Sequence, residues 1–102
     1  MRGVRVSRPV DRDMSDIWHY VANQSGSLET ADRLVESISS TFALFARAPE
    51  IGTMRDDIAS GVRGFPVGDY IIYYAVTERY IVVSRVPHGM QDQRSAYNNQ
   101  RA

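Results

Sequence analysis

Five residues in the second half of the chain have side chains suited to acid–base or electrostatic chemistry: Arg55, Arg63, Arg85, His88 and Tyr97. Metal-free RNA cleavage needs a base for the 2′-hydroxyl, an acid for the leaving oxygen, and cations for the charge that builds on phosphorus. His88 and Tyr97 are the candidates for proton transfer, and the arginines are the candidates for charge stabilisation. If the protein is a nuclease, we expect its catalytic residues to be Arg63, Arg85, His88 and Tyr97.

The same residues also have structural explanations. Arg85 alternates with the apolar residues of the segment 80–86. It is therefore expected on their face of a strand, where a partly buried guanidinium needs a carboxylate such as Asp16 or Asp92. His88 follows a proline and is suited to fix the turn after that strand. The chain contains no lysine, and arginine is a poor proton donor because its pKa lies above about 12. We therefore expect no complete nuclease centre.

The composition predicts one domain spanning residues 1–102, without disulfides or thiolate metal sites, because cysteine is absent. The 12 basic and 12 acidic residues cancel, which argues against binding nucleic acid mainly through bulk charge. No apolar run reaches the roughly 18 residues that span a bilayer. We expect a cytoplasmic protein without a cofactor, without membrane contact and without direct nucleic-acid binding.

Two helices are predicted in the first half of the chain. Apolar residues at positions 10, 14, 17 and 21 share one face of a helix over residues 10–24, with Pro9 in its first turn and Gly26 at its end. Ser27 is suited to cap a second helix, whose apolar residues recur every three or four positions to about Arg47. The short break between them predicts an antiparallel helical hairpin.

The acidic residues of the first helix, and Asp56 and Asp57 in the connection 49–61, show no metal-ligand spacing. We expect all of these carboxylates on solvated faces of the molecule.

A three-strand antiparallel meander is predicted for Val62–Val67, Tyr70–Val76 and residues 80–86, which are rich in β-branched and aromatic residues. Pro66 cannot donate to a ladder, so the first of these strands is irregular or open on one side. Residues 4–7 alternate and predict a short strand at a sheet edge, whereas residues 89–102 form either a short helix or a flexible tail. The expected fold is α+β: an N-terminal strand, and an antiparallel helical hairpin packed on a small antiparallel β-sheet.

Several local motifs in this order resemble the ParE branch of the ParE/RelE toxins from about residue 6 to residue 92. They are Asp13-x-x-Asp16-Ile17-Trp18-x-Tyr20, Pro49-x-Ile51-Gly52-x-x-Arg55, Gly61-x-Arg63-x-Phe65-x-Val67-Gly68-x-Tyr70-Ile71-Ile72-x-Tyr74, and Arg85-Val86-x-His88-Gly89-x-x-Asp92. The resemblance rests on their order and spacing together.

The resemblance implies the toxin of a type II toxin–antitoxin pair, held inactive by an antitoxin with a DNA-binding N-terminal part and a C-terminal tail that wraps the toxin. ParE toxins inhibit DNA gyrase by protein–protein binding. RelE-type relatives are ribosome-dependent mRNA endonucleases that typically use lysines in the middle connection and a C-terminal tyrosine.

The absence of lysine and the acidic connection make gyrase inhibition the first hypothesis and RelE-type mRNA cleavage the alternative. A third hypothesis is a ParE-like fold that has lost toxicity and serves only as a partner in autoregulated promoter binding.

The second helix carries five apolar residues in succession at positions 42–46, more than one buried face accommodates. We therefore expect the C-terminal tail or another chain to cover them, for example an antitoxin tail that adds a helix in a groove and a strand at an open sheet edge. The candidate residues for contact with the antitoxin or the target are Trp18, Phe42, Phe45, Arg55, Arg63, Tyr74 and Arg85.

Overall fold

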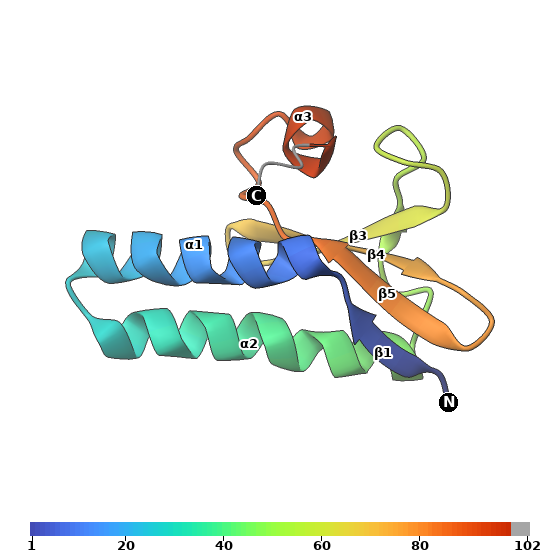
Figure 1. The fold of residues 1–102 in the computed structure, drawn as a ribbon, viewed down its shortest axis with the longest axis horizontal. Helices are drawn as coiled ribbons and strands as arrows, with labels where there is room; N and C mark the ends of the chain where they lie inside the picture. The colour runs from blue at the N-terminus through green and yellow to red at the C-terminus, as the bar shows by residue number, and fades with distance from the viewer. Residues whose placement is uncertain (99–102) are drawn as a thin grey trace.

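Residues 1–98 are described by a computed structural model, in which a helical hairpin and a separate β-sheet form an α+β fold (Figure 1). In chain order the elements are β1 (Gly3–Val6), α1 (Arg8–Ser25), α2 (Leu28–Arg47), β2 (Thr53–Met54), β3 (Val62–Val67), β4 (Tyr70–Val76), β5 (Tyr80–Arg85) and α3 (Gln93–Asn98). The predicted fold class is confirmed. The tail forms a short helix as far as Asn98, and the last four residues of the tail prediction lie outside the described part of the chain.

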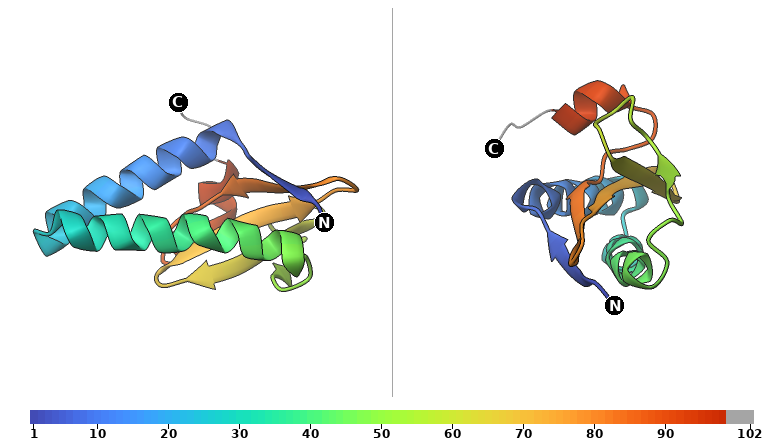
Figure 2. Two further views of the ribbon diagram at one scale, coloured as in Figure 1. Left: turned by 90° about the horizontal axis from the view of Figure 1, so that it is seen from below. Right: turned by 90° about the vertical axis from the view of Figure 1, so that its right-hand side faces the viewer.

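Local sequence signals set the ends of both long helices. Gly26 adopts a left-handed conformation with φ 68° and donates its N–H to Ala22, which ends α1. The Ser27 hydroxyl then accepts the N–H of Thr30 at 3.1 Å and caps α2. The two helices run side by side and form the predicted hairpin (Figures 1 and 2). Their connecting turn extends well past the sheet.

The sheet has the strand order β1-β5-β4-β3-β2. The antiparallel meander β3-β4-β5 is confirmed, and β1 lies at one edge as predicted, paired in parallel with β5. The two-residue strand β2 at the other edge was not predicted, because two residues give no periodicity to detect. It pairs only with Gly64 and Arg63, so β3 is open beside Pro66, as the missing proline N–H requires.

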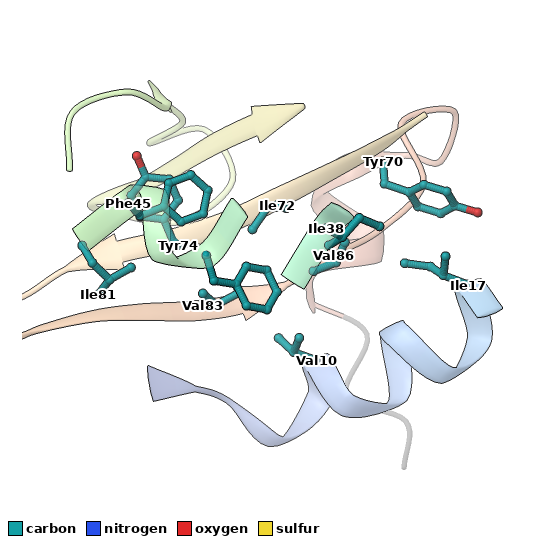
Figure 3. Packing of buried hydrophobic residues seen from close by; sticks show 11 residues of the cluster. Val10, Ile17, Ile38, Phe45, Tyr70, Ile72, Tyr74, Ile81, Val83 and Val86 are labelled. Carbon is teal, nitrogen blue, oxygen red and sulfur yellow. The ribbon is translucent and has the colours of Figure 1, made fainter. Parts of the chain in front are cut away.

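The main core lies between the helical hairpin and one face of the sheet (Figure 3). Phe45 of α2 is fully buried and stacks on the ring of Tyr74 of β4, with centroids 3.9 Å apart and planes 13° apart. Val10 and Ile17 bring α1 onto the same core. Removing an aromatic ring from such a site costs about 3–5 kcal/mol of unfolding free energy, so the stack fixes α2 on the sheet.

The main core accommodates only part of the apolar run at positions 42–46. Phe42 and Phe45 belong to this core, Leu44 and Ala46 are partly buried, and Ala43 is exposed. The expectation that the tail covers the run was wrong for its described part, because α3 packs on the opposite face of the sheet. Cover by another chain stays a prediction.

A second, smaller core lies on the opposite face of the sheet, where Tyr73 contacts Ile58, Val62 and Tyr97. Figure 2 shows α3 on the side of the sheet away from α2. The neighbouring tyrosines of β4 thus serve two different cores, since successive side chains of a strand point to opposite faces.

Candidate functional site

A partly buried ion pair joins α1 to the end of β5. Arg85 donates from Nε and Nη2 to the two carboxylate oxygens of Asp13, both at 2.9 Å, and the N–H of Val86 donates to Asp13 at 2.8 Å. The Arg85 and Asp13 side chains are only 13% and 10% exposed. The hydrogen bond to Asp13 raises the pKa of Arg85 above its ordinary value, so the guanidinium stays charged.

Structural ion pairing of Arg85 is confirmed, but the predicted partners Asp16 and Asp92 were wrong. Tyr73 faces Arg85 and Tyr74 faces Val83, so Ser84 is an extra residue that breaks the alternation of β5. The bulge moves Arg85 away from the face it would share with Val83. The expectation of a solvated face also fails for Asp13, which the ion pair buries.

His88 fixes the turn that follows β5, as predicted. Its Nδ1 accepts the N–H of Met90 at 3.0 Å, its own N–H donates to the Gln91 side chain at 3.0 Å, and its ring packs edge-on against Tyr70 with centroids 5.0 Å apart. A backbone bridge to Tyr70 ties the same turn to the start of β4.

The four nuclease candidates do not meet in one place. Tyr97 lies beside Arg85, which donates to its carbonyl at 3.0 Å, and the Tyr97 hydroxyl donates to Ser84 at 3.2 Å. Arg63 instead binds the Gly52 carbonyl at 2.8 Å. It faces Tyr74, whereas His88 faces Tyr70, and four residues of strand separate these positions by about 13 Å.

Three of the seven partner-contact candidates are buried inside the chain. Phe42, Phe45 and Tyr74 belong to the main core, and the Tyr74 hydroxyl holds the 49–52 loop by donating to Pro49 at 2.7 Å and accepting from Gly52 at 2.8 Å. In this structure these side chains are not on a surface that a partner reaches.

The other four candidates already have contacts within the chain. Besides Arg63 and Arg85, half-buried Trp18 donates to Asp32 of α2 at 2.7 Å, and Arg55 donates to both oxygens of exposed Asp57 at 3.0 Å. The hydrogen bond from Arg55 lowers the pKa of Asp57 below its ordinary value.

A cleft with a volume of about 460 Å³ lies between α1 and the segment 85–91. Its lining residues come from four elements and one turn: Asp13, Asp16, Ile17, Tyr20, Tyr70, Arg85, Val86, Pro87, His88, Gln91 and Ala96. Tyr20 and Tyr70 belong to the motifs that resemble ParE toxins, but neither was a candidate site residue. No local pattern shows that residues 20 and 70 share a cleft.

The second exposed feature is the open edge of the sheet at β1. All four residues of this strand are exposed, with Val4 at 38% and Val6 at 43%. The N–H groups of Gly3 and Ser7 bind β5, so the alternation of a parallel strand turns those of Val4 and Val6 outward. Arg5 lies across the Tyr80 ring, with its Cζ 4.1 Å from the ring centroid.

Among residues 1–98, no group of three or more His, Cys, Asp or Glu side chains is placed to hold a metal ion. Within the same residues, no helix has the length and apolar character needed to cross a membrane.

The fold is shared with a solved chain described as "Chromosomal ParDE TA system from P. aeruginosa", with a TM-score of 0.75 over 86% of this chain and 96% of that chain at 19% identity. This likeness shows that the two chains share one fold. Residues 4–93 also match the family described as ParE toxin of type II toxin-antitoxin system, parDE. The chain therefore belongs to the ParE toxin family.

Two curated relatives from Caulobacter vibrioides show the same relationship along most of the chain. Toxin ParE1 is 28% identical over 95 residues, which cover 93% of this chain and 97% of the relative. Toxin ParE3 is 26% identical over 83 residues, which cover 81% of this chain and 82% of the relative. The family match over residues 4–93 spans both long helices and the meander.

Proposed function

We propose that this ParE toxin acts without catalysis, by binding DNA gyrase in the cytoplasm, and that a cognate antitoxin neutralises it. The observation that carries the proposal is the position of Arg85: its guanidinium is bound to Asp13 and Tyr97 inside the molecule rather than presented to a substrate phosphate. Arg63, which a nuclease would need nearby, lies elsewhere on the sheet. A binding inhibitor needs only an exposed surface, and no proton-transfer group.

The open edge at β1 supports a neutralising partner of extended conformation. An unpaired strand edge offers backbone N–H and C=O groups to an added strand, and alternate side chains then give specificity. Val4 and Val6 supply exposed apolar contacts at this edge, and Arg2, Arg5 and Arg8 surround them with positive charge. We propose that the antitoxin tail adds a strand here, while a DNA-binding N-terminal part of the antitoxin controls its own promoter.

RelE-type mRNA cleavage on the ribosome remains the second candidate. The adjacency of Arg85 and Tyr97 is the observation in its favour, since an acid and a cation side by side are two parts of such a centre. A ParE-like fold without toxicity that serves only in promoter binding is the third candidate.

Purified gyrase supercoiling and a translation assay with mapped message cleavage decide between these functions. We expect the toxin to inhibit supercoiling and to leave ribosome-bound messages intact, and the Tyr97→Phe variant to inhibit gyrase like the parent chain. Message cuts within ribosome-bound codons that disappear in Tyr97→Phe would establish the RelE-type function instead. Inactivity in both assays supports the third candidate.

Strand addition by the antitoxin at β1 is tested by the variant Val4→Pro, with Val4→Ala as the matched control. Proline removes an N–H that faces outward and is therefore unpaired in the toxin alone, so the fold tolerates it. We expect Val4→Pro to weaken antitoxin binding at least tenfold, and Val4→Ala to weaken it much less. Equal binding by the two variants would exclude strand addition at β1.

A further inference from the structure

The buried tyrosine Tyr70 has a hydroxyl that no contact within the molecule uses. The residue is only 6% exposed, yet its hydroxyl makes no hydrogen bond to another residue of the described chain, and it lines the cleft beside α1. Figure 3 shows the Tyr70 ring near Ile17, with the hydroxyl directed away from the other labelled core side chains. No enclosed side-chain oxygen of the described residues lacks a partner, so the Tyr70 hydroxyl opens into the cleft, where a ligand can form a hydrogen bond with it.

The cleft also contains one unpaired negative charge. Asp13 and Arg85 neutralise each other at its inner end. Asp16, one helical turn farther along α1, is exposed and forms no ion pair or hydrogen bond with any residue from 1 to 98. A ligand that enters the cleft therefore meets the negative charge of Asp16.

Aromatic and apolar surfaces complete the walls. Tyr20, with 56% of its surface exposed, lines the same cleft as Tyr70. Burial raises the pKa of Tyr70, with Tyr20 and Asp69 contributing, so this hydroxyl stays neutral and is both a donor and an acceptor. Ile17 and Val86 give the cleft an apolar floor.

We propose that this cleft is a binding site for an arginine side chain presented by a protein partner. A guanidinium offers five donors in a plane, which suits a carboxylate and a phenol oxygen together, and its flat face stacks on aromatic rings. The methylene stem of arginine packs on apolar surface while the charged end stays near polar groups. Lysine matches less well because its ammonium is a strongly hydrated point charge without a flat face. An anionic side chain is repelled by Asp16.

The test is an NMR titration of the full-length ¹⁵N-labelled chain with N-acetyl-arginine methylamide. We expect saturable shifts of the amide signals of Asp16, Tyr20, Tyr70 and Gln91, with a dissociation constant of the order of millimolar, because one side chain alone supplies only a few kcal/mol. The corresponding lysine derivative should bind several-fold more weakly, and the leucine derivative should produce no saturable shift. Absence of saturation with arginine, or equal response to all three probes, would overturn the proposal.

Variants assign the binding to the two groups that carry the argument. Asp16→Asn should weaken binding of the arginine probe at least tenfold, and Tyr70→Phe, which keeps the ring and removes only the hydroxyl, about threefold to tenfold. Asp11→Asn, which removes a carboxylate of the same helix outside the cleft, is the matched control and should bind like the parent chain. An unchanged affinity in Asp16→Asn would place the probe elsewhere and refute the site. This titration uses neither gyrase nor the antitoxin, so its result is independent of the proposed function.

Discussion

Two arginine–aspartate pairs in this toxin share the same chemistry and differ in almost everything else. Arg85 and Asp13 are 72 positions apart in the sequence, both nearly buried, and join a helix to a strand. Arg55 and Asp57 are two positions apart, with side chains 30% and 61% exposed, and stay within one loop. A fork of two hydrogen bonds holds each pair.

The difference shows that environment, not the bond itself, decides what an ion pair does. A buried carboxylate that loses its partner stays out of water and uncompensated, whereas an exposed one is simply hydrated. Asp13 also accepts the N–H of Val86. It therefore binds both a side chain and a backbone group at the end of β5. The Arg85–Asp13 pair therefore connects α1 to β5, whereas the Arg55–Asp57 pair stabilises only its own loop.

The largest effect is expected from Asp13→Ala. This change removes the carboxylate that accepts from the Arg85 guanidinium and from the Val86 N–H, at a site where the Arg85 and Asp13 side chains are only 13% and 10% exposed. We expect it to cost about 3–5 kcal/mol of unfolding free energy. Chemical denaturation measures the difference. Arg55→Ala is the control and should cost less than about 1 kcal/mol. Equal losses in the two variants would mean that burial does not distinguish the pairs.

A smaller effect is expected when both members of the buried pair become apolar. The double variant Asp13→Leu with Arg85→Met removes both charges together, so no charge is left unpaired. The Val86 N–H and the Tyr97 carbonyl still lose their hydrogen-bond partners, at about 1–3 kcal/mol. Denaturation should therefore find the double variant more stable than Asp13→Ala alone. If the double variant is instead less stable than Asp13→Ala, the attraction between the two charges stabilises the fold by itself.

The smallest effect is expected from the exposed pair, and it concerns pH. The hydrogen bond from Arg55 lowers the pKa of Asp57 in the folded chain below its ordinary value of 3.8. The stabilisation is thus fully present above about pH 4 and is lost as the pH falls through the lowered pKa. An NMR titration of the Asp57 carboxyl should give a value below 3.8 that returns toward it in Arg55→Ala. A value at or above 3.8 in the parent chain would show that the pair does not persist in solution.

Local sequence patterns were sufficient for the elements and their order. The cap at Ser27, the left-handed Gly26, the apolar periodicity of both helices and the alternation of the meander are properties of neighbouring residues, and the structure confirms each of them. The strand β2 escaped prediction because its two residues are held by pairing with β3 alone.

The candidate site could be predicted only in part, for a related reason. The need of Arg85 for a carboxylate followed from its position in an apolar strand, but the identity of that carboxylate did not. The bulge at Ser84 changed the direction of Arg85, and the tilt of α1 brought Asp13 rather than Asp16 to it. Likewise, Phe42, Phe45 and Tyr74 were candidate contact residues until the sheet buried them.

The sequence by itself determined the two long helices and the three strands of the meander of this ParE toxin, because hydrogen bonding and apolar spacing within about ten residues define such elements. Only the tertiary structure decided which carboxylate neutralises Arg85, which aromatic rings are buried, and that Tyr70 and Asp16 face one cleft. These outcomes depend on how elements distant in the chain pack against one another. A shift of one residue in a strand register moves a side chain to the opposite face, and no local pattern contains that information.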